Sequence, residues 1–521
     1  MRFTTTVALA ACLLASMPAS AQKADTPAGD IAEEMDKKVA GEVAANWATA
    51  PVEEVTKSRS MKTAIDGKTI SYTATAGTLT IRDVKGKPTA SIFYTAYTVP
   101  SSGSRRRPVT FFYNGGPGSA SLWLRMGSFA PIHVRTTDPR AVAPAPFDVG
   151  PNPDTLIGST DMVFIDAVGA GYSRALGDTK PSEFYGVDQD VDGFAKAITR
   201  YVTRNKRWGD PKYIFGESYG TTRSGALTYK LEDEGMALNG VVLLSSILNY
   251  GIRQSGFDAI HIGYLPSYAA TAWYHNRVPD RPSDLAAFVD QARAFANGAY
   301  ATALAKGQDI SPEEEDAVAR EMSRFTGLSV DYLKRANLRV DLGRFRKELL
   351  RDQRLTVGRF DSRYTGIDDD AAGENPEYDA SSTGITGLYV SSFQDYLTRD
   401  LGYETDLAYR LSAREGGDFK WDWSHESPAG RTQNVADVTA DLSAAMRTNP
   451  HLRVLSLNGY YDMATPFFST ERDLKHMMLP ETLRPNLQFR YYPAGHMVYL
   501  NPEALHQMRL DLERFYAEDA R

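Results

Sequence analysis

Short apolar runs that end in glycine-rich loops recur along this chain. The runs and their loops are 109–113 with 114–118, 161–165 with 166–171, and 213–215 with 216–220. Helical patterns such as Val191 to Arg204 separate them. Continuous apolar runs of this length are typical of parallel strands that helices cover on both faces. The sequence therefore predicts an α/β fold with a mostly parallel central sheet flanked by helices.

The strand pattern stops near residue 250 and resumes near residue 431. Between them helical patterns dominate, as in Asp284 to Leu304 and in Ser311-Pro312-Glu313-Glu314, which has the capping pattern of a helix start. Beyond them, Val454 to Leu457 and the alternating Gln488 to Tyr492 predict further strands. We expect an α/β core of residues 22–250 and 431–521, interrupted by a mainly helical cap insertion at residues 251–430.

The first residues have the pattern of an export signal. Arg2 precedes an apolar stretch from Val7 to Met17, and Pro18-Ala19-Ser20-Ala21-Gln22 supplies a small-x-small cleavage pattern. The pattern predicts a signal peptide of residues 1–21 and an exported protein, periplasmic or secreted. No integral membrane segment is expected after cleavage, since the apolar stretch is too short to span a bilayer. The alternative is a lipid anchor on Cys12, because Leu9-Ala10-Ala11-Cys12 also resembles a lipobox.

The charge balance argues against one class of partner. The 521 residues include 58 Lys and Arg against 65 Asp and Glu, with no long basic run. Binding to a phosphate backbone needs clustered positive charge, so no nucleic acid partner is expected. The oligomeric state is not predicted.

Gly216-Glu217-Ser218-Tyr219-Gly220 is the G-x-S-x-G sequence of this chain. A strand that turns sharply into a helix places such a serine at the strand tip, and the flanking glycines leave room for neighbouring backbone. The N-terminus of the helix favours developing negative charge. Apolar residues precede the motif and a helix-compatible segment from Ser224 to Leu231 follows it, so we predict Ser218 as a nucleophile.

A serine hydroxyl needs a base and an orienting acid to act as a nucleophile. On a fold of this type both follow the serine, the acid before the base. His496 lies in a tight turn directly after the strand pattern 488–492, and Asp462 follows the strand pattern 454–457 through a turn. These positions predict a catalytic triad of Ser218, Asp462 and His496. A surface or structural role is expected for the other histidines after Ser218: His261, His275, His425, His451, His476 and His506.

The loop Asn114-Gly115-Gly116-Pro117-Gly118 ends an earlier predicted strand. One interpretation is a phosphate-binding loop, although the Gly-Lys-Ser/Thr ending of a nucleotide P-loop is missing. The other is an oxyanion hole, because this fold supplies one N–H from such a loop and a second from the residue after the nucleophile. The two N–H groups would be those of Gly116 and Tyr219.

Together these motifs resemble the serine carboxypeptidase family of the α/β-hydrolase fold. The segments that carry the resemblance are 114–119, 169–173 (Gly-Ala-Gly-Tyr-Ser), 216–220, and 458–462 with 495–497. The resemblance implies Ser218 as nucleophile, Asp462 as acid and His496 as base. It also implies that Asn114 and Glu217 bind the terminal carboxylate of the substrate.

Three positions depart from the family pattern, and one of them, Ala167 in place of a proline common in that loop, has little consequence. Ser119 stands where eukaryotic members have a cysteine, and Arg125 stands where many members have a second glutamate that shares a proton with the first. An arginine at this position is expected to pair with Glu217 or with the substrate carboxylate. The pH optimum of the family therefore does not carry over to this chain.

The resulting expectation is an exported serine carboxypeptidase that cleaves peptides with a free C-terminus through an acyl-enzyme. The chemistry needs no metal and no organic cofactor. A serine esterase or acyltransferase using the same triad is the first alternative, and a non-catalytic binding protein on this fold is the second. The preferred C-terminal residue is not predicted.

Overall fold

The computed structural model describes residues 49–100, 106–254 and 256–517. The predicted signal peptide at residues 1–21 and Cys12 lie outside the described residues. Within the described ranges, no helix is long and apolar enough to cross a membrane.

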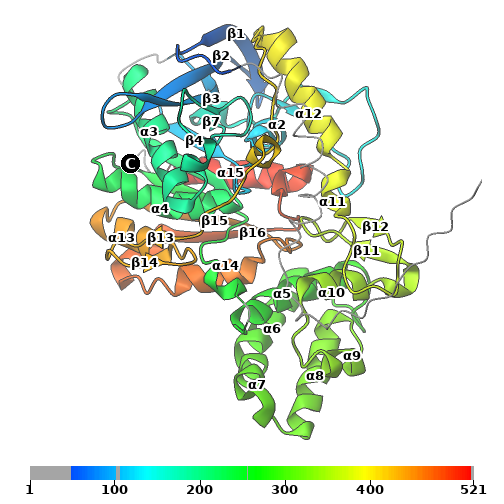
Figure 1. Ribbon diagram of the computed structural model, residues 1–521. Helices are drawn as coiled ribbons and strands as arrows, with labels where there is room; N and C mark the ends of the chain where they lie inside the picture. Colours follow the sequence, from blue (N-terminus) through cyan, green and yellow to red (C-terminus); the bar gives the residue numbers. More distant parts are fainter. Residues whose placement is uncertain (1–48, 101–105, 255, 518–521) are drawn as a thin grey trace, which may run out of the picture.

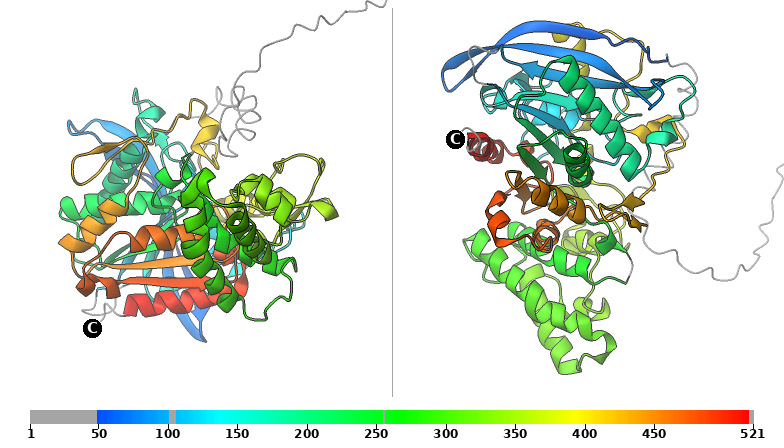
Figure 2. Two further views of the ribbon diagram at one scale, coloured as in Figure 1. Left: turned by 90° about the horizontal axis from the view of Figure 1, so that it is seen from below. Right: turned by 90° about the vertical axis from the view of Figure 1, so that its left-hand side faces the viewer.

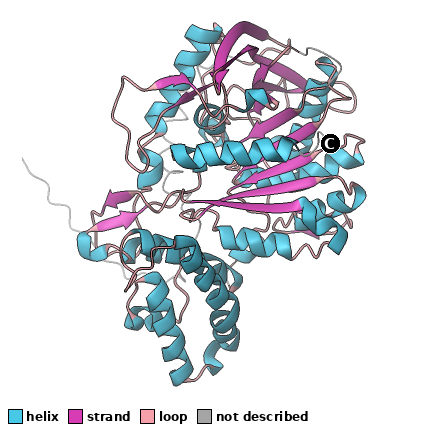
Figure 3. Cartoon of the chain, turned by 180° about the vertical axis from the view of Figure 1, so that it is seen from behind, coloured by secondary structure: helices cyan, strands magenta, loops and turns pink. Residues whose placement is uncertain are grey.

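A ten-stranded sheet runs through the protein (Figures 1 and 3). Its order is β1 (Thr56–Ile65), β2 (Lys68–Arg82), β3 (Pro88–Thr98), β7 (Asp161–Ile165), β4 (Val109–Tyr113), β9 (Lys212–Glu217), β10 (Gly240–Leu244), β15 (Arg453–Gly459) and β16 (Leu487–Tyr492), with β8 (Arg174–Ala175) beside β3. The strands from β7 to β16 are parallel, whereas β1, β2 and β3 pair antiparallel with their neighbours. The predicted mostly parallel sheet is confirmed.

The central strands are buried at every position because helices cover both faces of the sheet. One face carries α3 (Val187–Arg204), α4 (Tyr219–Asp233) and α13 (Thr439–Thr448). The other carries α2 (Leu122–Gly127), α12 (Thr386–Asp395) and α15 (Pro502–Ala517) (Figure 2). This layering is that of the predicted α/β fold.

The helices after β10 form a separate apolar cluster that projects away from the sheet (Figures 1 and 3). They are α5 (Ala259–Tyr274), α6 (Leu285–Phe295), α7 (Ala301–Lys306), α8 (Pro312–Thr326), α9 (Val330–Arg335) and α10 (Leu342–Glu348). Ser311 caps α8, since its side chain accepts the N–H of Glu314. Asp284 to Leu304, predicted as one helical pattern, is α6 followed by a π turn and α7.

Smaller elements follow in and just after residues 251–430. They are β11 (Leu355–Val357) with β12 (Thr365–Ile367), α11 (Ala380–Thr383), and β13 (His425–Glu426), which pairs with β14 (Thr432–Gln433). A return segment, residues 408–423, crosses the ends of the central strands. It forms backbone bridges between Ser412 and Ser119, Arg410 and Gly171, and Asp422 and Gly186. These bridges place the return segment over the glycine-rich loops.

Candidate active site

Ser218 lies in the sharp turn between β9 and α4. Its backbone has φ 60° and ψ −130°, a strained conformation for a residue other than glycine. A Cβ on Gly216 would lie 2.3 Å from the carbonyl oxygen of Gly220, so the turn needs the glycine. The Ser218 hydroxyl makes no hydrogen bond among the described residues; contacts of catalytic groups often tighten only when substrate binds. The motif therefore has the predicted elbow geometry.

His496 and Asp462 are paired. The two atoms His496 Nδ1 and Asp462 Oδ2 are 2.8 Å apart, and both side chains are buried. Asp462 Oδ1 accepts the N–H groups of Ala464 and Thr465 at 2.8 and 2.9 Å. The carboxylate therefore has a fixed orientation toward Nδ1, which leaves Nε2 as the free nitrogen of the imidazole.

Thr465 contacts both His496 and Asp462, and the sequence did not predict this contact. Its Oγ1 lies 2.7 Å from Asp462 Oδ2 and 3.1 Å from His496 Nδ1. It also donates to the carbonyl of Ser245 at 2.9 Å, which ties the acid's turn to the end of β10. The sequence does contain one indication of this role: Thr465 is a hydroxyl residue three positions after Asp462, within the same turn.

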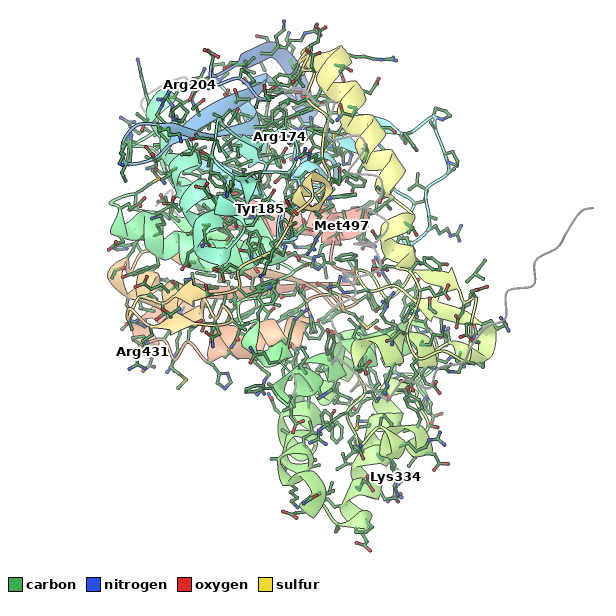
Figure 4. All side chains as sticks on the ribbon, viewed as in Figure 1. Arg174, Tyr185, Arg204, Lys334, Arg431 and Met497 are labelled. Atoms are coloured by element: carbon green, nitrogen blue, oxygen red, sulfur yellow. The ribbon has the colours of Figure 1, made fainter. Side chains whose placement is uncertain are left out.

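The segments that carry Ser218, Asp462 and His496 lie at one edge of the sheet. The Ser218 N–H donates to the carbonyl of Leu244, at the end of β10, and the next residue, Ser245, donates its Oγ to the carbonyl of His496 at 2.6 Å. Met497, the residue after His496, lies near the middle of Figure 4, above the projecting helices. The carboxyl ends of parallel strands share an edge, which is why residues far apart in the chain come together here.

The glycine-rich loop after β4 lies against the start of α4. A Cβ on Gly115 would lie 2.4 Å from the backbone nitrogen of Tyr219, so only glycine fits. Gly116 has φ 107°, a conformation that favours glycine. Within the described part of the chain, the N–H groups of Gly116 and Tyr219 donate no hydrogen bond. Both are therefore available to a ligand.

Asn114 and Glu217 contact each other beside Ser218. Asn114 Nδ2 donates to Glu217 Oε2 at 2.9 Å, and Asn114 Oδ1 accepts the N–H of Leu124 at 3.0 Å. The hydroxyl of Tyr499 donates to the same Oε2 at 2.9 Å. Burial raises the pKa of Glu217 to about 7, although both hydrogen bonds favour the ionised form. Tyr499 was missed because no motif marks it; only the fold brings it to Glu217.

Arg125 does not reach Glu217, so the first of its two expected pairings, with Glu217, is wrong. Its Nε donates to the hydroxyl of Tyr97 at 2.6 Å, Nη1 donates to the carbonyl of Ile132 at 3.2 Å, and the guanidinium lies 3.9 Å from the ring centre of Tyr396. Helix α2 directs the side chain toward β3 and the π turn after α12. Arg125 is fully buried in an aromatic environment.

Residues of the 251–430 region border the site on two sides. The ring of Tyr219 packs on Trp421 and Trp423 of the return segment, at centroid distances of 5.3 and 6.1 Å. On the other side, the ring of Phe360 lies 5.1 Å from the imidazole of His496, and its carbonyl accepts the His496 N–H at 2.6 Å. Aromatic rings of this region therefore lie against Tyr219 and His496.

The chain is similar to one family model and to solved structures of known proteins. Residues 67–249 match the family model for serine carboxypeptidases. Kex1(delta)p, a prohormone-processing carboxypeptidase from Saccharomyces cerevisiae, has a similar structure: 13% identity, TM-score 0.52, 86% of this chain and 91% of that chain covered. A proline iminopeptidase from Mycobacterium smegmatis has 13% identity and a TM-score of 0.36, with 85% and 98% covered. No curated protein sequence matches the chain.

At 13% identity the likeness to the yeast structure shows the fold alone. The family match adds information about the sequence, and it spans the part of the chain that contains Asn114, Glu217 and Ser218. The chain therefore has the α/β-hydrolase fold, and its residues 67–249 match the serine carboxypeptidase family model.

Proposed function

We propose that this protein is an exported serine carboxypeptidase that removes C-terminal residues from peptides through an acyl-enzyme. Ser218 Oγ attacks the carbonyl carbon of the last peptide bond while His496 Nε2 takes the hydroxyl proton. His496 gives that proton to the leaving amine, and the C–N bond breaks. Water then attacks the ester with His496 as base, which releases the shortened peptide and restores Ser218.

The observation that carries this proposal is the 2.8 Å contact between His496 Nδ1 and Asp462. A buried carboxylate that accepts the Nδ1 proton fixes the tautomer in which Nε2 is the base, and it stabilises the imidazolium that forms. Thr465 and the two backbone N–H groups on Asp462 support the same orientation.

The negative charge that develops on the substrate carbonyl oxygen would be held by the N–H groups of Gly116 and Tyr219. Their position at the N-terminus of α4 adds the favourable end of the helix dipole. Loss of one such donor typically costs about 10²–10³ in rate.

Asn114 and Glu217 would bind the terminal carboxylate of the peptide. Two ionised carboxylates would repel each other in a buried site. A Glu217 with a pKa of about 7 is neutral at mildly acidic pH and can donate a hydrogen bond to the substrate. This requirement predicts a preference for free C-termini that weakens as the pH rises above 7.

Three further parts of the proposal concern the rest of the chain. Residues 251–430 form a cap on a core of residues 22–250 and 431–521, supported by the contacts of Phe360 and Trp421 with the site. Export to the periplasm or outside the cell rests on the sequence pattern of residues 1–21, with a lipid anchor through Cys12 as the alternative. The chemistry uses no metal and no cofactor.

The test uses an N-blocked dipeptide with a free C-terminus and its C-terminal amide, with released amino acids identified by mass spectrometry. We expect cleavage of the free acid and labelling of Ser218 by a fluorophosphonate probe, both abolished in Ser218→Ala. Asp462→Asn should lower kcat by about 10⁴, because the imidazole loses its orienting acceptor. Full activity of Ser218→Ala would overturn the mechanism. Cleavage of esters alone would favour the esterase or acyltransferase alternative.

A further inference from the structure

We propose that Tyr499 is a positioning residue that fixes which oxygen of Glu217 faces the terminal carboxylate of the substrate. This inference rests on the proposed function, in which Glu217 binds that carboxylate. Tyr499 belongs to the loop that also carries His496. Its role concerns the orientation of the Glu217 proton and not the triad.

The hydrogen bonds around Glu217 have one consistent arrangement. The amide of Asn114 cannot flip, because its Oδ1 must accept the N–H of Leu124, so its Nδ2 is a donor to Glu217 Oε2. The Tyr499 hydroxyl contacts the same Oε2 at 2.9 Å. An oxygen that accepts two hydrogen bonds at these distances is the acceptor end of the carboxyl group. The proton of a neutral Glu217 therefore belongs on Oε1.

Tyr499 is rigidly placed. It belongs to η11 (Val498–Leu500), a buried 3₁₀ turn that follows His496 by one residue. Its ring packs so closely on α2 that a Cβ on Gly127 would lie 2.6 Å from Tyr499 Cδ2. Without the tyrosine hydroxyl, only Asn114 would hold Oε2, and the carboxyl group could rotate. One loop thus carries both the base and the hydroxyl that orients Glu217.

The groups that face Glu217 determine the sign of the pH effect. Burial is the largest influence and raises the pKa of Glu217, the Asp462 charge raises it as well, and His496 and the hydrogen bonds from Tyr499 and Asn114 lower it. Removing the Tyr499 hydroxyl removes a bond that favours the ionised form. The pKa of Glu217 should therefore rise further in Tyr499→Phe, while the neutral carboxyl loses its fixed orientation.

The experiment compares Tyr499→Phe with a matched control, Tyr389→Phe. The hydroxyl of Tyr389 is buried beside Gly127 and lies close enough to Glu217 to interact with its charge, but it has no hydrogen-bond partner in the described part of the chain. The substrates are an N-blocked dipeptide with a free C-terminus and its methyl ester, each measured across pH 4–9.

At pH 5, where Glu217 is neutral in all forms, we expect Tyr499→Phe to raise KM for the free acid about tenfold with little change in kcat. The ester should be unaffected. The alkaline fall of kcat/KM for the free acid should move to higher pH in this variant, and Tyr389→Phe should match the wild type. Equal losses on acid and ester, or an unchanged KM and an unmoved alkaline fall, would overturn the inference.

A second readout does not depend on turnover. The infrared carbonyl band of a protonated carboxyl, assigned to Glu217 by its loss in Glu217→Gln, can be titrated in both proteins. We expect the band to persist to higher pH in Tyr499→Phe, and an identical titration would overturn the inference. Failure of the proposed function looks different: the wild type itself would show no preference for the free acid over the ester.

Discussion

Arg223 and Asp190 form a fully buried ion pair behind the candidate active site. Arg223 Nε lies 2.7 Å from Asp190 Oδ2, and Nη2 lies 3.2 Å from Oδ1. The remaining Nη1 donates to the carbonyl of Asn114 at 2.9 Å. Arg223 belongs to α4 and Asp190 to α3, so one guanidinium joins two helices to the glycine-rich loop.

Arg223→Met should lower the free energy of unfolding by about 3–5 kcal/mol, because it leaves the Asp190 carboxylate buried without a partner. The double variant Arg223→Met/Asp190→Leu should lose less, since it removes the uncompensated charge as well. Urea denaturation of both variants measures the difference. A double variant less stable than Arg223→Met would contradict this account.

A second charge cluster, centred on the buried His425, lies beside α3, away from the candidate active site. His425 Nδ1 lies 2.6 Å from Asp188 Oδ1, and its Nε2 lies 3.0 Å from Asp441 Oδ2. Burial disfavours the charged imidazole, but the two carboxylates outweigh burial and raise the pKa of His425 to about 9. The imidazolium anchors the hairpin of β13 and β14, which follows the return segment with Trp421 and Trp423.

A histidine whose pKa rises on folding stabilises the protein below its unfolded pKa of about 6.5, and this contribution is lost as the pH rises through the folded value of about 9. His425→Gln should therefore cost up to about 3 kcal/mol at pH 6 and much less at pH 10. Urea midpoints at both pH values give the difference from wild type. His451→Gln, at an exposed histidine, is the control. If the loss of stability in His425→Gln were the same at both pH values, the charged imidazole would not be the stabilising group.

The sheet could be predicted from the sequence because it depends on local patterns, and so could the placement of Asp462 and His496 just after strands. The apolar runs at 109–113 and 161–165 coincide with β4 and β7. His496 and Asp462 follow directly after predicted strands, and parallel strands bring such positions to one edge. β1 was not predicted, because an edge strand with mostly exposed polar residues lacks the alternation of a half-buried strand.

Long-range partners of the site could not be predicted. Tyr499 meets Glu217 across 282 positions of the chain, and nothing in either segment specifies that contact. Arg125 shows the opposite case: its position was judged from the family pattern, but the side chain follows the face of α2 and contacts Tyr97. Sequence motifs located the residues at strand ends, whereas side-chain direction depended on packing between distant elements.

The close contact of Gly115 with α4 gives a test of the predicted oxyanion hole. Gly115→Ala would place a methyl group 2.4 Å from the Tyr219 nitrogen, which must displace either the loop or that N–H group. We expect kcat for the free-acid peptide to fall about 10²–10³-fold, the usual cost of one lost donor. Gly387→Ala, where the added Cβ meets nothing within 4 Å, is the control and should keep wild-type activity. An active Gly115→Ala enzyme would argue against an oxyanion hole at this loop.

Arg125 provides the final prediction, because the resemblance to serine carboxypeptidases led us to expect a second acidic residue at its position. Its guanidinium contacts Tyr97 and the ring of Tyr396, and within the described residues it forms no ion pair. Arg125→Met keeps the length and apolar stem of the side chain but removes the charge.

Since Arg125 is not among the groups that shift the pKa of Glu217, the alkaline fall of kcat/KM on a free-acid peptide should stay where it is in the wild type. Stability should change by less than about 2 kcal/mol, because loss of the cation–π contact is offset by removal of a buried charge. The pH profiles of Arg125→Met and Tyr499→Phe, measured side by side, check this. If the alkaline fall moves in Arg125→Met but not in Tyr499→Phe, then Arg125 rather than Tyr499 influences the pKa of Glu217, and the prediction is wrong.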